Sequence, residues 1–334
     1  MQLCLSNCLA ALSPQNIVTI RLVSMLIILV GGLISGYFAT NRFAVTEHWA
    51  KKIMTIVLVF FNWQIALLVI WQMQLSRQLI WMPIICVASM LLITALSAAI
   101  FSFLRLDRRS KLTLILAGGL SNMGYTGGAF VCYAFFGTTG LALANIYPMF
   151  WSPVVCLIFF PLLKINELHT KGSEIKFSLT ELFDARFLVI PAVIAAVFLN
   201  LTGVKPLAFV TKFYIIDILV YTASALAFFA IGLRVKVSHL KKHISLYFPL
   251  VAVKYILTPA VTAIMLWLLA LAGQDLTDLV QKVIIILSAT PSAVLMVTMS
   301  NVFDLDGPLA SALWVVTMAV FAIVVVPVLF FFFI

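Results

Sequence analysis

Apolar runs of about twenty residues, nearly free of charged side chains, follow one another along almost the whole chain. An α-helix of this length matches the hydrocarbon thickness of a bilayer, so each run predicts a transmembrane helix. Hydrophobic residues make up 64% of the 334 positions, which is more apolar surface than a soluble protein of this size can bury. We therefore expect an all-α integral membrane protein with the lipid bilayer as its solvent.

We place about ten transmembrane helices on these runs. The turn FFGTTG at residues 135–140 divides the fourth from the fifth, because the uncharged stretch 112–163 is too long for one span. The predicted spans are residues 17–39, 52–72, 79–104, 112–135, 140–162, 187–203, 213–233, 245–271, 282–302 and 307–334.

Basic residues in the loops predict the orientation of these spans. If the N-terminus is outside, most Lys and Arg residues fall in cytoplasmic loops such as 105–111 and 163–186, as the positive-inside rule requires. The basic residues behind the net charge of +10 gather in these loops, as is typical of membrane proteins. The charge therefore does not indicate a nucleic-acid partner, and we expect none. Ten spans place both termini outside, on a multi-pass protein of a bacterial inner membrane or a plasma membrane. The external loops hold only Arg77, Lys205, Lys212 and Lys282.

The chain matches itself weakly at an offset near half its length. Spans 1–5 fall close to spans 6–10 at this offset. Five spans per half is an odd number, so the second half must enter the membrane from the opposite face. The sequence therefore predicts two inverted five-helix repeats, at residues 1–163 and 187–334, joined by a cytoplasmic linker at 164–186. The offset is shared by two pairs of prolines, Pro83 with Pro249 and Pro161 with Pro327.

Two spans carry helix-breaking residues at membrane depth. The fourth contains SNMGYTGG at residues 121–128, and the ninth contains SATPSAV at residues 288–294. Non-helical backbone is tolerated at this depth only where it is buried in protein or lines a wet cavity. Paired interruptions at corresponding places in two repeats are typical of the substrate site of a secondary transporter. Each break is expected to expose backbone N–H groups at the start of a half-helix, which attract an anion. Alternatively, Gly127 and Gly128 allow close helix packing.

Several segments resemble one known family. SNMGYTGGAFVCYAFFGTTGLALANIY is similar to the fourth and fifth spans of the auxin efflux carrier family, within the bile acid/sodium symporter-like superfamily of membrane transporters. FFAIGLRV at 228–235, VKYILTPAV at 253–261 and SATPSAVLMVTMSNVFDLDGPLAS at 288–311 resemble its seventh, eighth and ninth spans. The resemblance implies a scaffold of spans 1, 2, 6 and 7, a transport core of spans 3–5 and 8–10, and broken fourth and ninth helices that cross. It also implies transport of a small organic anion, auxin-like or dicarboxylate-like.

By this resemblance Asn122 and Gly124 match the first crossover and Pro291 matches the second. Relatives often have a proline in the first crossover, where this chain has none. The substrate-binding residues that we predict at the two interruptions are Asn122, Gly124, Tyr125, Gly127, Pro291 and Ser292.

Other polar residues lie within the spans. Lys254 is deep in the eighth span, where a lysine costs about 2.5–3.5 kcal/mol to insert, so it contacts the anion, braces the crossover or snorkels to the inner face. Asn62 and Gln64 in the second span either face the substrate or form hydrogen bonds between helices. Asp217 either stabilises a helix start at the interface or couples transport to a proton or cation. We interpret Arg21 as a snorkelling anchor at the membrane surface.

The sequence favours a carrier over other classes of membrane protein. HLKKH at residues 239–243 lacks the glutamate of an HExxH metal motif, and no G-x-S-x-G elbow occurs, so we expect neither an enzyme nor a metal or cofactor site. We expect a secondary transporter that works by alternating access, with its site at the crossing of helices 4 and 9. An anion channel or a membrane ligand sensor of the same fold is the alternative, and a homodimer stays open as its assembly.

Overall fold

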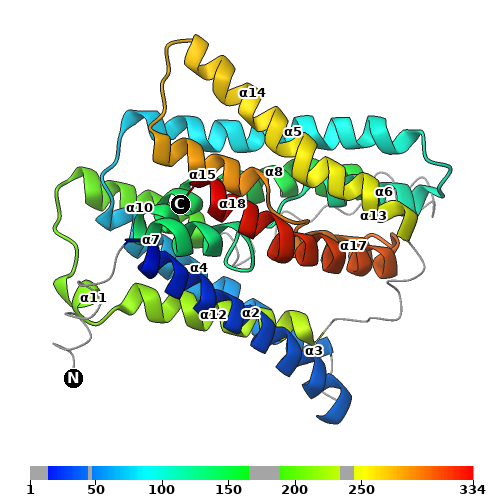
Figure 1. Cartoon of the computed structure of the whole chain (residues 1–334), viewed down its shortest axis with the longest axis horizontal. Helices are drawn as coiled ribbons and strands as arrows, with labels where there is room; N and C mark the ends of the chain where they lie inside the picture. The colour runs from blue at the N-terminus through cyan, green and yellow to red at the C-terminus, as the bar shows by residue number, and fades with distance from the viewer. Residues whose placement is uncertain (1–13, 44–46, 165–187, 234–243, 334) are drawn as a thin grey trace.

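The computed structural model describes residues 14–43, 47–164, 188–233 and 244–333. These residues are mostly α-helical and contain no β-strand beyond one isolated bridge (Figure 1). The N-terminal twelve residues and the predicted linker, apart from Lys164, lie outside the described residues.

The long helices often contain a five-residue π-helical turn, so one apolar run carries two helix labels. The helices are α2 (Pro14–Phe43), α3 (Glu47–Ile56), α4 (Asn62–Gln72), α5 (Trp81–Ser102), α6 (Arg108–Gly119), α7 (Gly128–Ile146), α8 (Trp151–Val154), α10 (Val189–Leu201), α11 (Ala208–Lys212), α12 (Ile215–Gly232), α13 (Ile244–Ala252), α14 (Thr258–Leu271), α15 (Asp278–Ser288), α16 (Val294–Val302), α17 (Gly307–Val320) and α18 (Val326–Phe333). The π-helical turns are Val57–Phe61, Val155–Phe159, Val253–Leu257 and Phe321–Val325.

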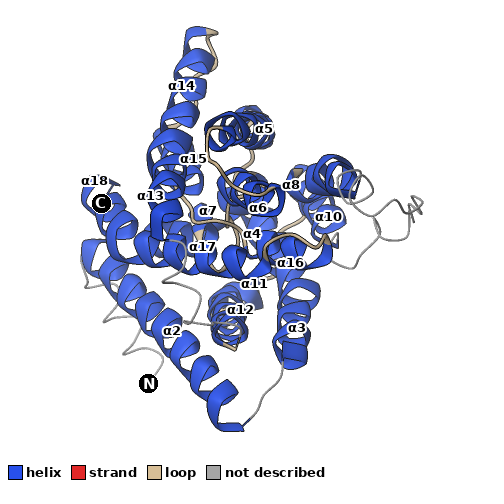
Figure 2. Cartoon of the chain, turned by 90° about the vertical axis from the view of Figure 1, so that its right-hand side faces the viewer, coloured by secondary structure: helices blue, strands red, loops and turns tan. Residues whose placement is uncertain are grey.

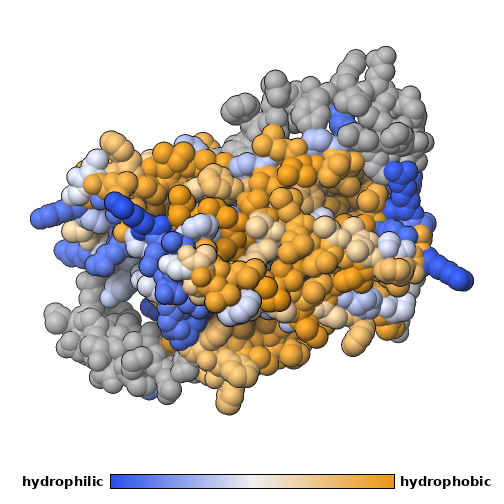
Figure 3. Space-filling view, turned by 90° about the horizontal axis from the view of Figure 1, so that it is seen from above, coloured by the Kyte–Doolittle hydropathy of each residue, from blue (hydrophilic) through white to orange (hydrophobic). Residues whose placement is uncertain are grey.

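Seven helical segments of the described chain are long and apolar enough to cross a membrane. Their side chains form an apolar belt across the middle of the molecule, with hydrophilic residues at both ends (Figure 3). The chain is therefore an all-α, multi-pass membrane protein. The seven segments are Val18–Thr40, His48–Gln72, Arg77–Ser102, Gly128–Lys164, Ile215–Gly232, Ile244–Leu271 and Gly307–Phe333.

Seven continuous segments are fewer than the ten predicted spans, for local reasons. The predicted fourth and ninth spans are each divided into two short helices, and the sixth, Val189–Leu201, is a shorter apolar helix. The fifth runs on from the second half of the fourth through a kink at Gly137, where φ is +62° and ψ is −148°. The turn predicted at 135–140 is thus a single glycine in a backbone conformation that other residues rarely adopt. The ten-span inverted repeat stays a prediction.

The helices pack in two groups. Figure 2 shows α5, α6 and α12 end-on. In the first group α12 packs along α2 and α3, and α4 packs against α10. In the second group α5 packs on α6 and α14, α15 on α7, and α17 on α6 and α13. Helix α7 also contacts α2 and α4, so it connects the two groups.

Glycines bring α2 and α12 into backbone contact. A Cβ atom on Gly36 would lie 2.3 Å from the Phe229 carbonyl oxygen, and one on Gly232 would lie 2.4 Å from the Leu33 carbonyl oxygen. Small residues of this kind let helices approach closely in a membrane, where van der Waals packing drives their association. The same close approach was the alternative explanation for the glycines of the fourth span.

Candidate functional site

Two interrupted helices meet in the middle of the molecule. Residues 120–127 separate α6 from α7, and residues 289–293 separate α15 from α16; we call them the first and second interruption. Ser121 and Ser292 form an antiparallel bridge between the two. The backbone N–H of Asn122 donates to the Pro291 carbonyl at 2.8 Å, and that of Ala293 donates to the Leu120 carbonyl at 2.9 Å. Both breaks fall where the glycines and the proline of the sequence place them.

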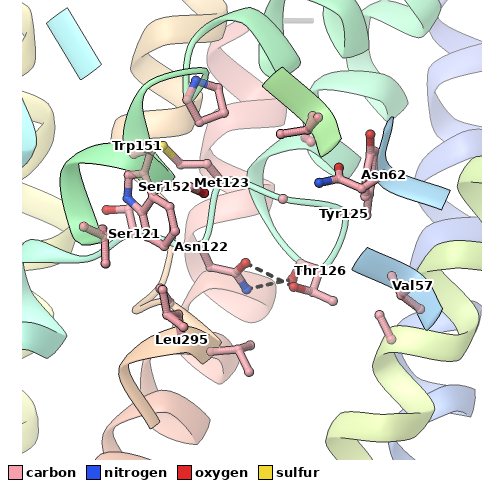
Figure 4. A pocket seen from close by; sticks show the side chains of 18 of the residues that line it. Val57, Asn62, Ser121, Asn122, Met123, Tyr125, Thr126, Trp151, Ser152 and Leu295 are labelled. Atoms are coloured by element: carbon pink, nitrogen blue, oxygen red, sulfur yellow. Dashed lines mark hydrogen bonds between the residues drawn. The ribbon is translucent and has the colours of Figure 1, made fainter. Parts of the chain in front are cut away.

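The first interruption is a tight loop that closes on itself. The Asn122 carbonyl accepts from the N–H of Gly128 at 3.0 Å, and the Asn122 side chain exchanges two hydrogen bonds with Thr126 (Figure 4). A Cβ atom on Gly127 would lie 2.2 Å from the Asn122 carbonyl oxygen, whereas one on Gly124 would meet nothing within 4 Å. Gly127 is therefore required by close packing within the loop, and Gly124 is not.

The start of α7 differs from our expectation of free backbone donors. The N–H groups of Gly127, Gly128 and Ala129 donate to carbonyl groups of the same loop. They are therefore not free for a ligand, because the loop is short enough for its own carbonyls to reach them. At the start of α16, by contrast, the N–H groups of Val294 and Leu295 find no acceptor among the described residues. The prediction of exposed donors is therefore wrong for the N–H groups of Gly127, Gly128 and Ala129.

A cavity of about 530 Å³ lies against both interruptions. Its wall contains no charged side chain among the described residues. The wall includes the aromatic residues Tyr125 and Trp151 and the amide residue Asn62 (Figure 4). Phe160 and Asn145 line it as well. The volume suits a small organic molecule, and such a mixture of apolar surface with a few polar groups is typical of ligand sites.

The predicted site residues divide into two sets. Asn62, Asn122, Gly124 and Tyr125 line the cavity. The other predicted site residues are not among those that line the cavity. Gly127, Pro291 and Ser292 shape the two interruptions, and Gln64 donates to the Phe60 carbonyl of its own helical segment at 2.9 Å. Lys254 donates to Ser121, and Asp217 accepts from Tyr133.

Lys254 is completely buried, at 0% exposure, so the snorkelling interpretation is wrong. Its Nζ donates to the Ser121 hydroxyl at 2.6 Å and lies 3.5 Å from the carbonyl oxygens of Gly118 and Leu120. These oxygens belong to the end of α6 and the start of the first interruption, where a helix leaves carbonyl groups without intrahelical donors. Lys254 therefore braces the break from behind. Ser121 separates it from the cavity.

Ser292 joins the second interruption to its surroundings. Its hydroxyl donates to the Ala117 carbonyl of α6 at 2.7 Å, and its N–H donates to the Thr317 hydroxyl of α17 at 3.3 Å. Pro291 has no N–H to donate, so its carbonyl alone takes part in the bridge to Asn122.

Among the wall residues that the sequence analysis did not predict are Asn145, Thr126 and Trp151. Tyr125 donates its hydroxyl to Asn145 Oδ1 at 3.0 Å, and Thr126 fixes the side chain of Asn122. Asn145 carried a signal, as an amide inside the apolar run LALANIY. Thr126 and Trp151 carried none, because their positions depend on how the loop folds and on which helix faces the cavity.

Asp217 and Arg21 both contact Tyr133 of α7 and do not contact Lys254. Asp217 is in the first turn of α12 and accepts a hydrogen bond from the Tyr133 hydroxyl. The Arg21 guanidinium carbon lies 5.4 Å from the centre of the Tyr133 ring. Arg21 is therefore turned toward α7, where the aromatic face attracts the cation. The interpretation of Arg21 as a snorkelling anchor stays a prediction.

No group of three His, Cys, Asp or Glu side chains within the described ranges could hold a metal ion. No protein-family model matches this chain, and no curated protein matches it.

Proposed function

We propose that this protein is a secondary membrane carrier of a small organic anion. The observation that supports the proposal is the contact between two interrupted helices at the wall of a cavity, formed by Asn122 with Pro291 and by Leu120 with Ala293. Such breaks need a functional reason, because unpaired backbone at membrane depth costs several kcal/mol per group. Interrupted helices that meet near the midplane are the usual substrate site of secondary carriers.

Electrostatics favours an anion as the substrate. The described residues of the cavity wall include no carboxylate, and Val294 and Leu295 at the start of α16 line it. A helix start carries partial positive charge and binds carboxylates and phosphates well. The buried Lys254 side chain adds a cation behind Ser121. One cation and one helix start suit a single carboxylate attached to an apolar body, so we expect a monocarboxylate to bind more tightly than a dicarboxylate.

We further propose the architecture of the auxin efflux carrier family for this chain. It would comprise ten spans in two inverted repeats, residues 1–163 and 187–334. The packing supports a division into a scaffold, formed by α2, α3, α4, α10 and α12, and a core that carries both interruptions. Alternating access would move the core against the scaffold around a fixed site.

A thermal-shift screen with the purified full-length protein tests the binding step. A carboxylate present at 100 times its dissociation constant should stabilise the folded protein by about 2.7 kcal/mol. We expect a series of aromatic and aliphatic monocarboxylates to raise the melting temperature and the matching uncharged amides to leave it unchanged. Equal shifts for acids and amides would contradict an anion site.

Counterflow in proteoliposomes tests the transport step. A carrier preloaded with unlabelled carboxylate should accumulate labelled carboxylate transiently, with a rate that saturates. Single-channel currents without counterflow would instead show an anion channel, and binding without any flux would show a ligand sensor.

A further inference from the structure

A second group of polar side chains lies between the first interruption and the start of α12. It consists of Arg21, Tyr133, Asp217 and Tyr221, which we call the outer cluster. The Tyr133 hydroxyl donates to the Asp217 carboxylate, and the Arg21 guanidinium lies over the Tyr133 ring. The ring of Tyr221 meets that of Tyr133 edge-on at 5.8 Å. Three helices, α2, α7 and α12, are thus tied together at Tyr133.

Further contacts join α12 to the first interruption and to α7 beyond the outer cluster. Later along α12, Ser224 donates its hydroxyl to the Tyr125 carbonyl of the first interruption at 3.2 Å. The rings of Phe228 and Phe130 lie 6.5 Å apart between the same two helices. Tyr133 is only 1% exposed. The first interruption and the first half of α7 therefore contact α12 at three successive levels, through Tyr125, Phe130 and Tyr133.

The cavity reaches the surface at the other end of the molecule. Its wall includes Val302, the last residue of α16, which is 65% exposed. The turn that follows Val302 is tied to the basic start of α6 by the Arg109–Asp304 ion pair, at 2.9 Å. Val302 therefore brings the cavity wall to the surface at this end, whereas the contacts of the outer cluster lie where α12 begins.

Gly137 allows Arg21 to take its place in the cluster. A Cβ atom at this position would lie 2.9 Å from an Arg21 guanidinium nitrogen, and the glycine has φ +62°. The kink that separates the fourth from the fifth span therefore also leaves room for the cation. Arg21 on the first packing group is in this way seated against the α7 kink.

From these contacts we propose that Tyr133, Asp217 and Arg21 form a latch that closes the cavity at the end of the molecule where α12 begins. Releasing the hydrogen bond between Tyr133 and Asp217 separates α7 from α12 and opens that end. The inference rests on the proposed function, because only a carrier must open its two ends in turn. Tyr133 and Asp217 are positioning residues in this account, since neither lines the cavity.

Cysteine modification measured from one face at a time tests the latch. Cys156 lines the cavity and is partly buried, so a small membrane-impermeant methanethiosulfonate reagent can report which end is open. The full-length protein is measured in right-side-out and in inside-out vesicles. When the reagent is added on the side of the membrane where α12 begins, we expect Tyr133→Phe to raise the modification rate of Cys156 about 10-fold, equivalent to about 1.4 kcal/mol. Peptide mass spectrometry assigns the modified cysteine.

Matched variants separate the latch from a general loosening of the fold. Tyr37→Phe removes the same hydroxyl from an exposed position on α2 and should leave the rate unchanged. Asp217→Asn keeps an oxygen that accepts from Tyr133, so its effect should be smaller than that of Asp217→Ala. Unchanged rates in both Tyr133→Phe and Asp217→Ala would overturn the latch, and so would equal rises from both faces. Carboxylate binding by the unaltered protein is measured separately, so a failed latch leaves the proposed function standing.

Discussion

Lys254 is a lysine that is completely buried, at 0% exposure, within an apolar span. Lys254 has no carboxylate partner among the described residues and donates instead to Ser121 and to carbonyls at the end of α6. A helix that stops inside a membrane leaves its last carbonyl groups without donors, and the ammonium supplies them. We infer that this contact is what makes the first break tolerable at membrane depth.

Lys254→Met should therefore destabilise the fold. Losing the donor removes the hydrogen bond to the Ser121 hydroxyl and the contact with the Gly118 carbonyl, which should lower the free energy of unfolding by about 1–3 kcal/mol in denaturant titrations. Lys282→Met is the control, because its partly exposed pair with Asp278 should contribute less than about 0.5 kcal/mol. Equal losses in the two variants would show that Lys254 does not brace the break.

The charge of Lys254 can be tested apart from its hydrogen bonds. Lys254→Gln keeps a donor of similar reach without the cation. If the ammonium attracts the substrate, this variant should be more stable than Lys254→Met and still bind carboxylates at least about 10-fold more weakly than the unaltered protein, a loss of about 1.4 kcal/mol. Unchanged carboxylate affinity in Lys254→Gln would leave the helix start at Val294 as the source of anion binding.

At the scale of helices, the first interruption depends on one glycine more than on another. We expect Gly127→Ala to lower the free energy of unfolding by about 1–3 kcal/mol, because its Cβ would collide with the Asn122 carbonyl. Gly124→Ala adds the same methyl group in open space and should change stability by less than about 0.5 kcal/mol. Thermal unfolding of both variants checks the pair, and a reversed order would mean that the loop packs differently.

The close contact of α2 and α12 has its own matched pair of glycines. Gly36→Ala should push the two helices apart, at a cost of about 1–3 kcal/mol, since its Cβ would lie 2.3 Å from the Phe229 carbonyl oxygen. Gly31→Ala on the same helix meets nothing within 4 Å and should be neutral. Melting temperatures in one detergent are enough for the comparison. Equal melting temperatures would contradict the packing of α2 on α12.

Apolar length and helix-breaking residues made much of the helix arrangement predictable. The last span, predicted at 307–334, is the segment Gly307–Phe333, and both breaks fall within the predicted stretches. The helix of the second span begins at Glu47, earlier than predicted. The prediction began later because the first residues of this helix include charged side chains, which a hydropathy pattern leaves out of a membrane span. The bounds of apolar segments follow from local composition, whereas polar helix extensions do not.

The site was less predictable, because its contacts join residues far apart in the chain. Asn122 and Pro291 could be selected as helix breakers, but the partner of Lys254 could not, since Ser121 is on another span. Likewise, nothing near Arg21 in the sequence indicates the ring of Tyr133. Partners of this kind depend on which helix faces pack together, and a single sequence does not contain that information in local form.

For the whole molecule, the two packing groups and the position of the cavity suggest how transport could occur. α2 and α12 are joined by glycine contacts, whereas both interruptions belong to the other group. α7 contacts both groups, so a movement between them must break or slide the contacts of α7. The cavity is lined by residues of both groups, such as Asn62 and Asn122, so an anion bound as we propose would lie where the two groups meet.

The most direct test is a cryo-EM structure of the full-length protein with the tightest-binding carboxylate from the thermal-shift screen. We predict ligand density in the cavity, with the carboxylate near the N–H groups of Val294 and Leu295 and the body of the ligand beside Tyr125 and Trp151. Continuous helices across residues 120–127 and 289–293, or a ligand bound away from both interruptions, would contradict the account.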